Sequence, residues 1–289
     1  MQKKVISLAI AGAFLLPFAA FAEDAPPPDP LSFNVGVVSD YLFRGVSQTH
    51  GKPALQGGID YAFANGAYVG TWLSTITWVK DGYGSGSTEI DVYGGYKNTF
   101  AGGDWNYDIG YITYNYPGHG NQLPNVNTGS NPNTQELYGA LGYKWISAKY
   151  SYTTSSHFIG WTGGPDAAGN YTGNTRGSNY LELNANYDLG DGWTLIGHVG
   201  HQKVKNYTAT TALQSADYTD WKFGASKDVG FGVVSLVYSD TNTKGTCSST
   251  GGTNSYCWAN GNFVSGAGST TGFRDVSKGT AVLSFLKTF

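Results

Sequence analysis

Apolar and polar residues alternate with a period of two along most of the chain, which is typical of β-strands with two different faces. In the segment 178–189, for example, Leu181 and Leu183 alternate with Glu182 and Asn184. Twelve segments follow this pattern: 32–43, 54–64, 67–78, 87–97, 105–115, 134–145, 148–157, 178–189, 193–203, 217–227, 231–240 and 279–289. No helical period is found after residue 22. The pattern predicts an all-β protein.

The connections between these segments alternate in length. They are short after the even-numbered segments, as at Gly190–Gly192 and Asp228–Gly230, and generally longer after the others, up to the stretch 241–278. Short turns at one end and long loops at the other are typical of transmembrane β-barrels. We therefore predict a transmembrane antiparallel up-and-down β-barrel of about twelve strands over residues 32–289. The alternative is a soluble β-barrel with its apolar face inside.

Aromatic residues near the predicted short-turn ends favour the membrane protein. Tryptophan and tyrosine settle at the headgroup level of a bilayer, whereas a soluble core gives them no reason to lie at one height. The residues assigned to this girdle are Phe33, Trp105, Trp145, Trp193, Trp221, Phe231 and Phe289. Phe289 lies on the last segment, which we expect to close the barrel against the first, because lipid-facing backbone groups must all be paired.

The first residues have the order of a secretory signal peptide: Lys3 and Lys4, an apolar run, and then Ala20-Phe21-Ala22. A membrane-anchoring helix is the alternative, but the run is short and contains Pro17. We expect a signal peptide at 1–22, cleaved after Ala22, and a Pro-rich periplasmic linker at 23–31. The location predicted is the outer membrane of a Gram-negative bacterium. The expected partners are outer-membrane lipid and lipopolysaccharide, small solutes, and the assembly machinery that engages the C-terminal strand.

Composition agrees with this interpretation. The chain has 42 Gly and 21 Tyr but only 13% charged residues. Aromatics favour strands, and glycine marks turns and thins strand faces. No basic patch stands out in the sequence, which argues against nucleic acid as a partner.

If the apolar faces meet lipid, the polar faces line the lumen. The residues predicted to line the pore or its constriction are Asp40, Arg44, Gln48, Asp60, Glu89, Asp91, Asp108, Glu136, Lys144, Lys149, Glu182, Asp188 and His198. Two interpretations stay open: an ion-pair network that braces and nearly plugs the barrel, and a charged constriction that selects solutes. Acids outnumber bases, so a pore would have a weak preference for cations.

Asp40, Arg44 and Gln48 lie at four-residue spacing near the predicted start of the first external loop, and we expect a mouth or constriction there. The alternative is that Arg44 pairs with a carboxylate of a neighbouring strand and only braces the barrel. External aromatics such as Trp161, Tyr171 and Trp258 are interpreted as an upper girdle or as a platform for a ring-shaped solute.

Cys247 and Cys257 are the only cysteines, and they flank a polar, Gly-rich stretch. In an exported protein this spacing predicts a disulfide that staples a loop. The spacing fits neither a CxxC redox site nor a zinc site. Asp166 lies in a Gly-rich loop but lacks the ligand spacing of a calcium loop. We expect no metal and no cofactor.

No serine lies in a G-x-S-x-G elbow, although His157, His198 and His201 are available to a hydrolase. We therefore expect no enzyme activity. The predicted function is a porin-like channel for passive diffusion of ions or small polar solutes through a narrow charged lumen. The alternatives are a structural or adhesive surface barrel without conductance, and a hydrolase embedded in the barrel.

The stretch from Val35 to Ile76 carries Ser39-Asp40-Tyr41-Leu42-Phe43-Arg44-Gly45-Val46-Ser47-Gln48, then Pro53 with Gln56-Gly57-Gly58, then Gly66 with Tyr68-Val69-Gly70. This stretch resembles the opening of the TorF-like porins, the Gcw-type conserved outer-membrane proteins. "EIDVYGGY" and "YDIGYITYNYPG" are similar to the next two strands of that family. The resemblance implies an outer-membrane channel and carries no catalytic residues. Lys287 departs from the hydrophobic residue preferred two positions before the terminal aromatic.

Overall fold

The computed structural model describes residues 29–119, 131–163, 173–207, 214–260, 263–264, 268–269 and 272–289. The predicted signal peptide lies outside these residues, and so do residues 23–28 of the predicted linker. Asp166 and Tyr171 also lie outside them.

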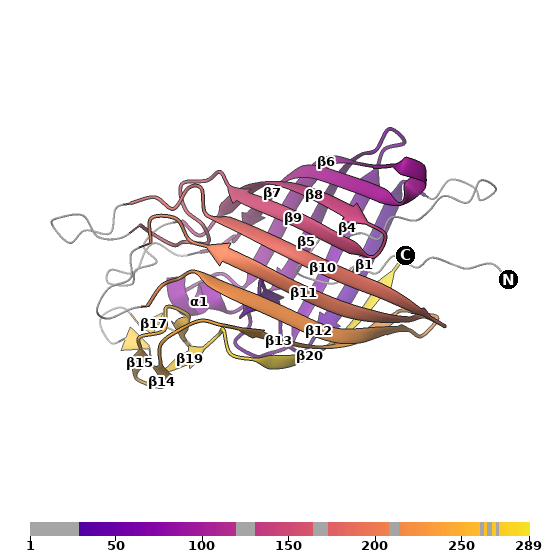
Figure 1. Cartoon of the computed structure of the whole chain (residues 1–289). Helices are drawn as coiled ribbons and strands as arrows, with labels where there is room; N and C mark the ends of the chain where they lie inside the picture. Colours follow the sequence, from indigo (N-terminus) through magenta and orange to yellow (C-terminus); the bar gives the residue numbers. More distant parts are fainter. Residues whose placement is uncertain are drawn as a thin grey trace.

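Twelve antiparallel strands form one closed barrel, which confirms the predicted fold class (Figure 1). Their bounds are β1 Leu31–Val38, β4 Ala54–Ala62, β5 Ala67–Thr75, β6 Thr88–Phe100, β7 Trp105–Asn115, β8 Thr134–Tyr143, β9 Ile146–Thr153, β10 Asn179–Gly190, β11 Trp193–Lys203, β12 Tyr218–Asp228, β13 Val233–Thr241 and β20 Thr280–Thr288. Each strand pairs with its neighbours along the chain, so the topology is the simple up-and-down one.

The last strand closes the barrel against the first, as predicted. In the β1–β20 pair, Val35 lies opposite Lys287. Beyond the ladder, the backbone N–H of Phe289 donates to the carbonyl of Phe33 at 2.8 Å. The ammonium of Lys287 lies 4.9 Å from the centre of the Phe289 ring. The seam is therefore paired along its length.

The barrel is apolar outside and polar inside. Ile109 and Leu236 are 61% and 58% exposed on the outer face, whereas Glu89 and Glu136 are 1% and 0% exposed inside. This is the reverse of a soluble barrel, whose alternating strands turn their apolar face inward. The alternation predicted from the sequence thus has the orientation expected of a lipid-facing wall. Among the described residues, no helix is both long and apolar enough to cross a membrane.

One end of the barrel carries tight turns, and the other carries the long connections (Figure 1). The β10–β11 turn contains Gly190 and Gly192, both at positive φ, with Asp191 between them. A short 3₁₀ turn, η1 (Ala101–Gly103), joins β6 to β7 at the same end. The alternation of connection lengths in the sequence therefore predicted the two ends.

The loop end carries small elements of its own. They are the hairpin of β2 (Leu42–Phe43) and β3 (Val46–Ser47), the helix α1 (Trp78–Tyr83), and the strands β14 (Cys247–Ser248), β15 (Gly251–Gly252), β16 (Cys257–Ala259), β17 (Phe263–Val264), β18 (Gly268–Ser269) and β19 (Phe273–Asp275). The predicted disulfide joins Cys247 to Cys257.

Six residues of the predicted aromatic girdle lie at the turn end: Phe33, Trp105, Trp145, Trp193, Phe231 and Phe289. Trp221 does not. It is the fourth residue of β12, which starts at the loop end, and it lies between Val199 of β11 and Asp240 of β13. Its ring faces outward and stacks on Phe223. The alternation predicted the outward face of Trp221. Its predicted position at the turn end was wrong, because the residue lies near the loop end of β12.

Candidate functional site

The connection between β1 and β4 folds into the mouth of the barrel. Its β2–β3 hairpin turns at Arg44 and Gly45, whose φ values are 50° and 78°. A two-residue turn with positive φ at both positions matches the twist of a β-hairpin, and glycine adopts the second position without strain. Phe43 and Val46 on either side of the turn are buried. The hairpin is thus packed inside the barrel mouth, and its tip is a cation.

Arg44 reaches the opposite wall and forms a two-point ion pair with Glu136 of β8. Nη2 lies 2.6 Å from Oε2, and Nη1 lies 3.1 Å from Oε1. The side chains of Arg44 and Glu136 are 6% and 0% exposed. Because β8 lies five places from β1 by the shorter way around the twelve-stranded barrel, this pair crosses the lumen. It is not the neighbouring-strand brace considered as the alternative.

Groups on strands β10 to β12 complete the socket for Arg44. Nη1 also donates to Oε1 of Gln202 on β11 at 2.8 Å, and the guanidinium lies 4.4 Å from the centre of the Tyr180 ring. The hydroxyl of Tyr218 donates to the Arg44 carbonyl at 2.8 Å. Planar stacking and forked hydrogen bonds are geometries that arginine satisfies and lysine does not. The ion pair, the stacking on Tyr180 and the hydrogen bond to the Arg44 carbonyl together fix the hairpin tip.

Asp40 organises the base of the same loop. Its Oδ1 accepts the hydroxyls of Ser47 at 2.5 Å and Thr49 at 2.9 Å, and the N–H of Gly51 at 3.3 Å. Burial raises the pKa of Asp40 above its ordinary value, and the hydrogen bonds from Ser47 and Thr49 oppose that rise. Gln48 is buried and donates to the carbonyl of Val46. Gln48 thus supports the hairpin from within.

Two cavities meet at Asp40. One, of about 60 Å³, lies beside the hairpin and is lined by Arg44, His198 and Lys222 among others. The second, of about 360 Å³, lies towards the loop end and is lined by Arg274 and Lys278 among others. Asp40 lines both. The Asp40 carboxyl group therefore lies between the two cavities.

Strands β10 to β12 contribute a hydrogen-bonded cluster around His198. Nε2 of His198 lies 2.9 Å from Oδ2 of Asp220, and Nδ1 lies 2.6 Å from Oδ1 of Asn184. Tyr180 donates to Oδ1 of Asp220 at 2.7 Å, and Glu182 lies 3.6 Å from Nδ1. Every polar group of this cluster has a partner, which rigidifies the wall.

The opposite wall, from β4 to β9, carries most of the acids. Asp60 accepts a hydrogen bond from Tyr93 at 2.5 Å, and Asp108 accepts one from Tyr68 at 2.6 Å. The ammonium of Lys149 lies 4.2 Å from the centre of the Tyr138 ring. These residues face inward, as the sequence alternation predicted for Asp60, Asp108 and Lys149.

Glu89 and Asp91 are buried acids that each have one carboxylate oxygen without a hydrogen-bond partner among the described residues. The two oxygens are Oε2 of Glu89 and Oδ1 of Asp91. Both side chains lie on β6, two residues apart on its inner face. Buried carboxylate oxygens without partners are costly in a protein interior, and a wet lumen would compensate them.

Two residues predicted to line the pore lie elsewhere. Lys144 sits in the β8–β9 turn at a φ of 52°, and its exposed ammonium lies 3.6 Å from Asp104. Asp188 is exposed at the turn end of β10, where it accepts the N–H of Gly190 at 2.7 Å. The alternation predicts which face a side chain occupies only within the regular part of a strand. Lys144 and Asp188 both lie at the turn-end rim of the barrel, where the strands end.

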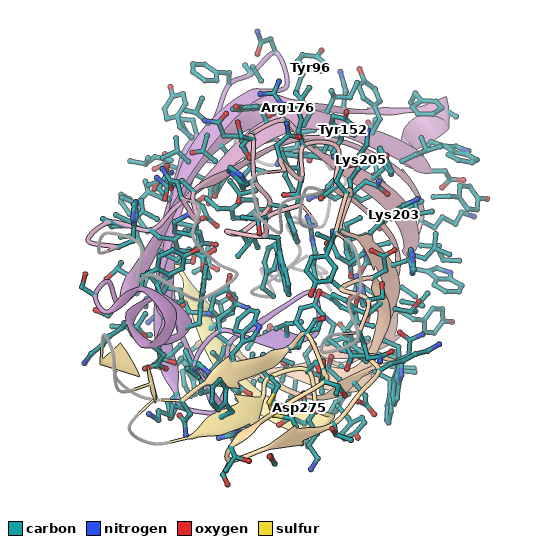
Figure 2. The ribbon with its side chains drawn as sticks, turned by 90° about the vertical axis from the view of Figure 1, so that its left-hand side faces the viewer. Tyr96, Tyr152, Arg176, Lys203, Lys205 and Asp275 are labelled. Atoms are coloured by element: carbon teal, nitrogen blue, oxygen red, sulfur yellow. A yellow bond between two sulfur atoms is a disulfide. The ribbon has the colours of Figure 1, made fainter. Side chains whose placement is uncertain are left out.

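Aromatic rings pack together in the mouth of the barrel. Trp161 contacts Tyr256 with their ring centres 5.5 Å apart, and Trp258 contacts Trp78 at 5.7 Å. Trp161 and Tyr256 are buried. The interpretation of Trp161 and Trp258 as an upper girdle was therefore wrong, because both pack on other loop residues. Figure 2, viewed from the loop end, shows side chains projecting from the wall into the interior.

Three residues of the site were not among the predicted pore-lining residues: Tyr180, Gln202 and Asp220. The alternation pointed to all three, because each lies on the polar face of its strand. Tyr180 shares that face with Glu182, Gln202 with His198, and Asp220 with Lys222. No sequence signal showed that Arg44 would meet them, because that contact depends on the inward fold of the loop. Within the described part of the chain, no group of three or more His, Cys, Asp or Glu is placed to hold a metal ion.

A family model described as "Bacterial protein of unknown function (Gcw_chp)" matches residues 22–265. The chain belongs to the Gcw_chp family. The matched range includes the inward hairpin, its Arg44 and the partner Glu136. The comparison with curated proteins gives no match.

Similar solved structures of this Gcw_chp chain include a KdgM porin in complex with disordered oligogalacturonate, with 9% identity, a TM-score of 0.47, and coverage of 90% of this chain and 98% of that one. A NanC porin has 12% identity, a TM-score of 0.46, and coverage of 89% and 98%. Pseudomonas aeruginosa OprD has 10% identity, a TM-score of 0.39, and coverage of 90% and 66%.

Proposed function

We propose that this Gcw_chp protein is an outer-membrane channel for ions and small polar solutes, narrowed by its inward-folded first external loop. The observation that carries the proposal is the Arg44–Glu136 pair, which anchors a loop across the lumen of a barrel whose outer face is apolar. A loop held in this way leaves a narrow polar route and excludes wide solutes.

The outer face supports the membrane location. Leu55 and Leu183 are at least half exposed, and the same is true of Phe223, Leu236 and Leu283. An exposed apolar surface distributed over all sides of a closed barrel has no favourable place in water, but it matches acyl chains. We infer an outer membrane because closed barrels with short turns at one end and long loops at the other occupy that membrane.

The inner face supports transport of small polar species. The inward acids are Asp40, Asp60, Glu89, Asp91, Asp108, Glu136, Glu182 and Asp220, and the inward bases are Arg44, Lys97, Lys149 and Lys222. Carboxylates thus outnumber cations on the lumen wall. We propose a weak preference for cations, with Asp40 as the acid that lines both cavities.

Several further points belong to the same proposal. We propose that residues 1–22 are a cleaved signal peptide, that β20 carries the contact for the assembly machinery, and that the protein is related to the TorF-like porins. Catalysis plays no part in the proposal, since the His198 cluster has the character of a structural network.

Recording of refolded protein in planar bilayers tests the proposal. We expect small, steady conductance steps and a reversal potential that favours potassium over chloride. A protein that shifts on a gel on heating, as a folded barrel does, yet never conducts would instead be a structural or adhesive barrel. Lipase or protease activity that disappears in His198→Ala would indicate a barrel-embedded hydrolase, and would contradict the proposal.

A further inference from the structure

A row of cations lies on the outer surface of the barrel, at the loop end of β9, β10 and β11. Lys203 is the last residue of β11 and faces outward, and Lys205 follows it. Arg176 precedes β10 and is also exposed. Across the sheet, Lys203 lies opposite Asn179, which lies opposite Tyr152 of β9. Figure 2 shows Arg176, Tyr152, Lys205 and Lys203 following one another around the rim.

The backbone brings Lys205 and Tyr152 close together at Gly177. A Cβ atom at this glycine would lie 3.0 Å from Cδ of Lys205 and 3.1 Å from the hydroxyl oxygen of Tyr152. Gly177 has a φ of 87°, and its N–H donates to the carbonyl of Thr153 at 2.9 Å. A larger residue at position 177 would separate the two side chains. The ammonium and the phenol are therefore held as neighbours.

Arg176, Lys203 and Lys205 are all exposed. None of them takes part in the ion pairs of the described residues. The nearest acid along the adjoining strand connection is Asp217, and its Oδ1 accepts the N–H of Val204 at 2.8 Å. The cluster thus presents three positive charges on a chain whose net charge is −3.

Directly below the cations lies the apolar wall. Leu181 and His201 form the next outward pair, and Leu183 and Val199 form the one after it. Leu181 and Leu183 are 53% and 50% exposed. If this wall faces acyl chains, then Lys203 lies at the headgroup level of the leaflet on the loop side. That leaflet of the outer membrane contains phosphorylated glycolipid.

We propose that Arg176, Lys203 and Lys205 form a site for the phosphate groups of lipopolysaccharide, with Tyr152 as an additional hydrogen-bond donor. The inference rests on the outer-membrane location proposed above, but not on conductance. Charge-assisted hydrogen bonds from arginine and lysine are the strong interactions that phosphate makes with proteins. Each cation near an anionic lipid surface strengthens the attraction by about fivefold, and the three cations act together. The lipid would then brace the β9–β11 side of the barrel.

A binding titration tests this site. Refolded wild-type protein in neutral detergent is titrated with bisphosphorylated lipid A, and so is the triple variant Arg176→Gln, Lys203→Gln, Lys205→Gln. We expect the variant to bind at least about tenfold more weakly, from the loss of three charge contacts. The matched control replaces Lys144, Lys227 and Lys287 with glutamine. These cations lie at the turn end, and we expect affinity within about twofold of wild type because charge attraction fades within a Debye length.

Heat-modifiable migration verifies that each variant is folded before titration. Equal affinity of the rim variant and the wild type would overturn the proposal. Equally tight binding of dephosphorylated lipid A would also overturn it, because the phosphates would then play no part. Displacement of lipid A by equimolar inorganic phosphate would overturn the glycolipid assignment. Conductance of the rim variant is expected to equal that of wild type, so failure of this site and failure of the channel proposal are distinguishable.

Discussion

Arg44 and Glu136 are separated by 92 residues in the chain and meet as a buried ion pair across the barrel lumen, with 2.6 Å between Nη2 and Oε2. Tyr114 and Thr153 donate further hydrogen bonds to the same carboxylate at 3.2 Å and 3.4 Å. Removal of one partner of a buried pair leaves an uncompensated charge, which typically costs about 3–5 kcal/mol. The pair is therefore the most sensitive point of the loop.

Arg44→Ala is expected to release the hairpin from the far wall. The barrel strands keep their backbone hydrogen bonds, so we expect the barrel to fold. The packing of the hairpin against the far wall should be weakened by about 3 kcal/mol. Single-channel conductance is expected to rise at least about twofold, because the hairpin no longer holds its place in the lumen. Bilayer recording measures this change, and hydrogen exchange at residues 42–47 measures the loosened loop.

Lys52→Ala is the matched control for this change, because Lys52 is an exposed cation in the same connection. Its conductance should equal that of wild type. Unchanged conductance in Arg44→Ala, together with a lower heat-modification midpoint, would mean that the pair only braces the barrel.

Acidification is expected to reduce the preference for cations earlier than ordinary aspartates would. Burial raises the pKa of Asp40, so the folded protein takes up this proton at a higher pH than an exposed aspartate does. As the pH falls from neutral, Asp40, which lines both cavities, loses its negative charge at a higher pH than an exposed aspartate does. Reversal potentials measured over a pH series test this expectation.

Asp40→Asn is the control for that series, because it removes the titrating charge and keeps a similar shape. We expect a weaker cation preference at neutral pH and no early acid transition. If wild type and Asp40→Asn change in parallel with pH, another carboxyl group sets the selectivity.

Leu183→Arg is expected to destabilise the barrel by about 2–4 kcal/mol, because Leu183 lies outward near the middle of β10 and a lipid-facing charge is costly at the midplane. Leu189→Arg, on the same strand near the turn end, is expected to cost about 0–1 kcal/mol. Denaturant unfolding in lipid vesicles measures both. Equal costs at the two depths would contradict a lipid-facing wall.

Reduction of the Cys247–Cys257 disulfide is expected to loosen the β14–β15 region without opening the barrel. The bridge closes a loop with a sequence separation of 10, for which the chain-entropy account gives about 3 kcal/mol. Limited proteolysis of the reduced protein should cut between residues 247 and 257 and spare the strands. A large fall in the heat-modification midpoint would instead show that this loop supports the whole barrel.

The sequence alone predicted the strands, their order, the two ends and the seam. These depend on alternation and turn residues, which are local properties, and the face of Asp60, Glu89 or Glu182 follows from parity alone. The same reasoning gave the face of Trp221 but not its height, because height depends on where β12 begins.

The candidate site was predictable only in part. Arg44 and Asp40 could be assigned to the mouth, but the partner of Arg44 could not, because the contact joins residues 92 positions apart through the conformation of one loop. For the same reason, the packing of the buried Trp161 and the half-buried Trp258 in the mouth could not be predicted from the alternation. Packing among loops is set by tertiary contacts rather than by a local period.

The β1–β20 seam has a consequence for biogenesis. The pair Val35–Lys287 joins opposite ends of the barrel sequence, so no closed form exists until β20 has been synthesised. Until then both seam strands expose free backbone edges, which invite pairing with other chains. In an outer-membrane protein, as proposed here, such edges would have to be kept apart before insertion, and insertion would be a late, all-or-none event.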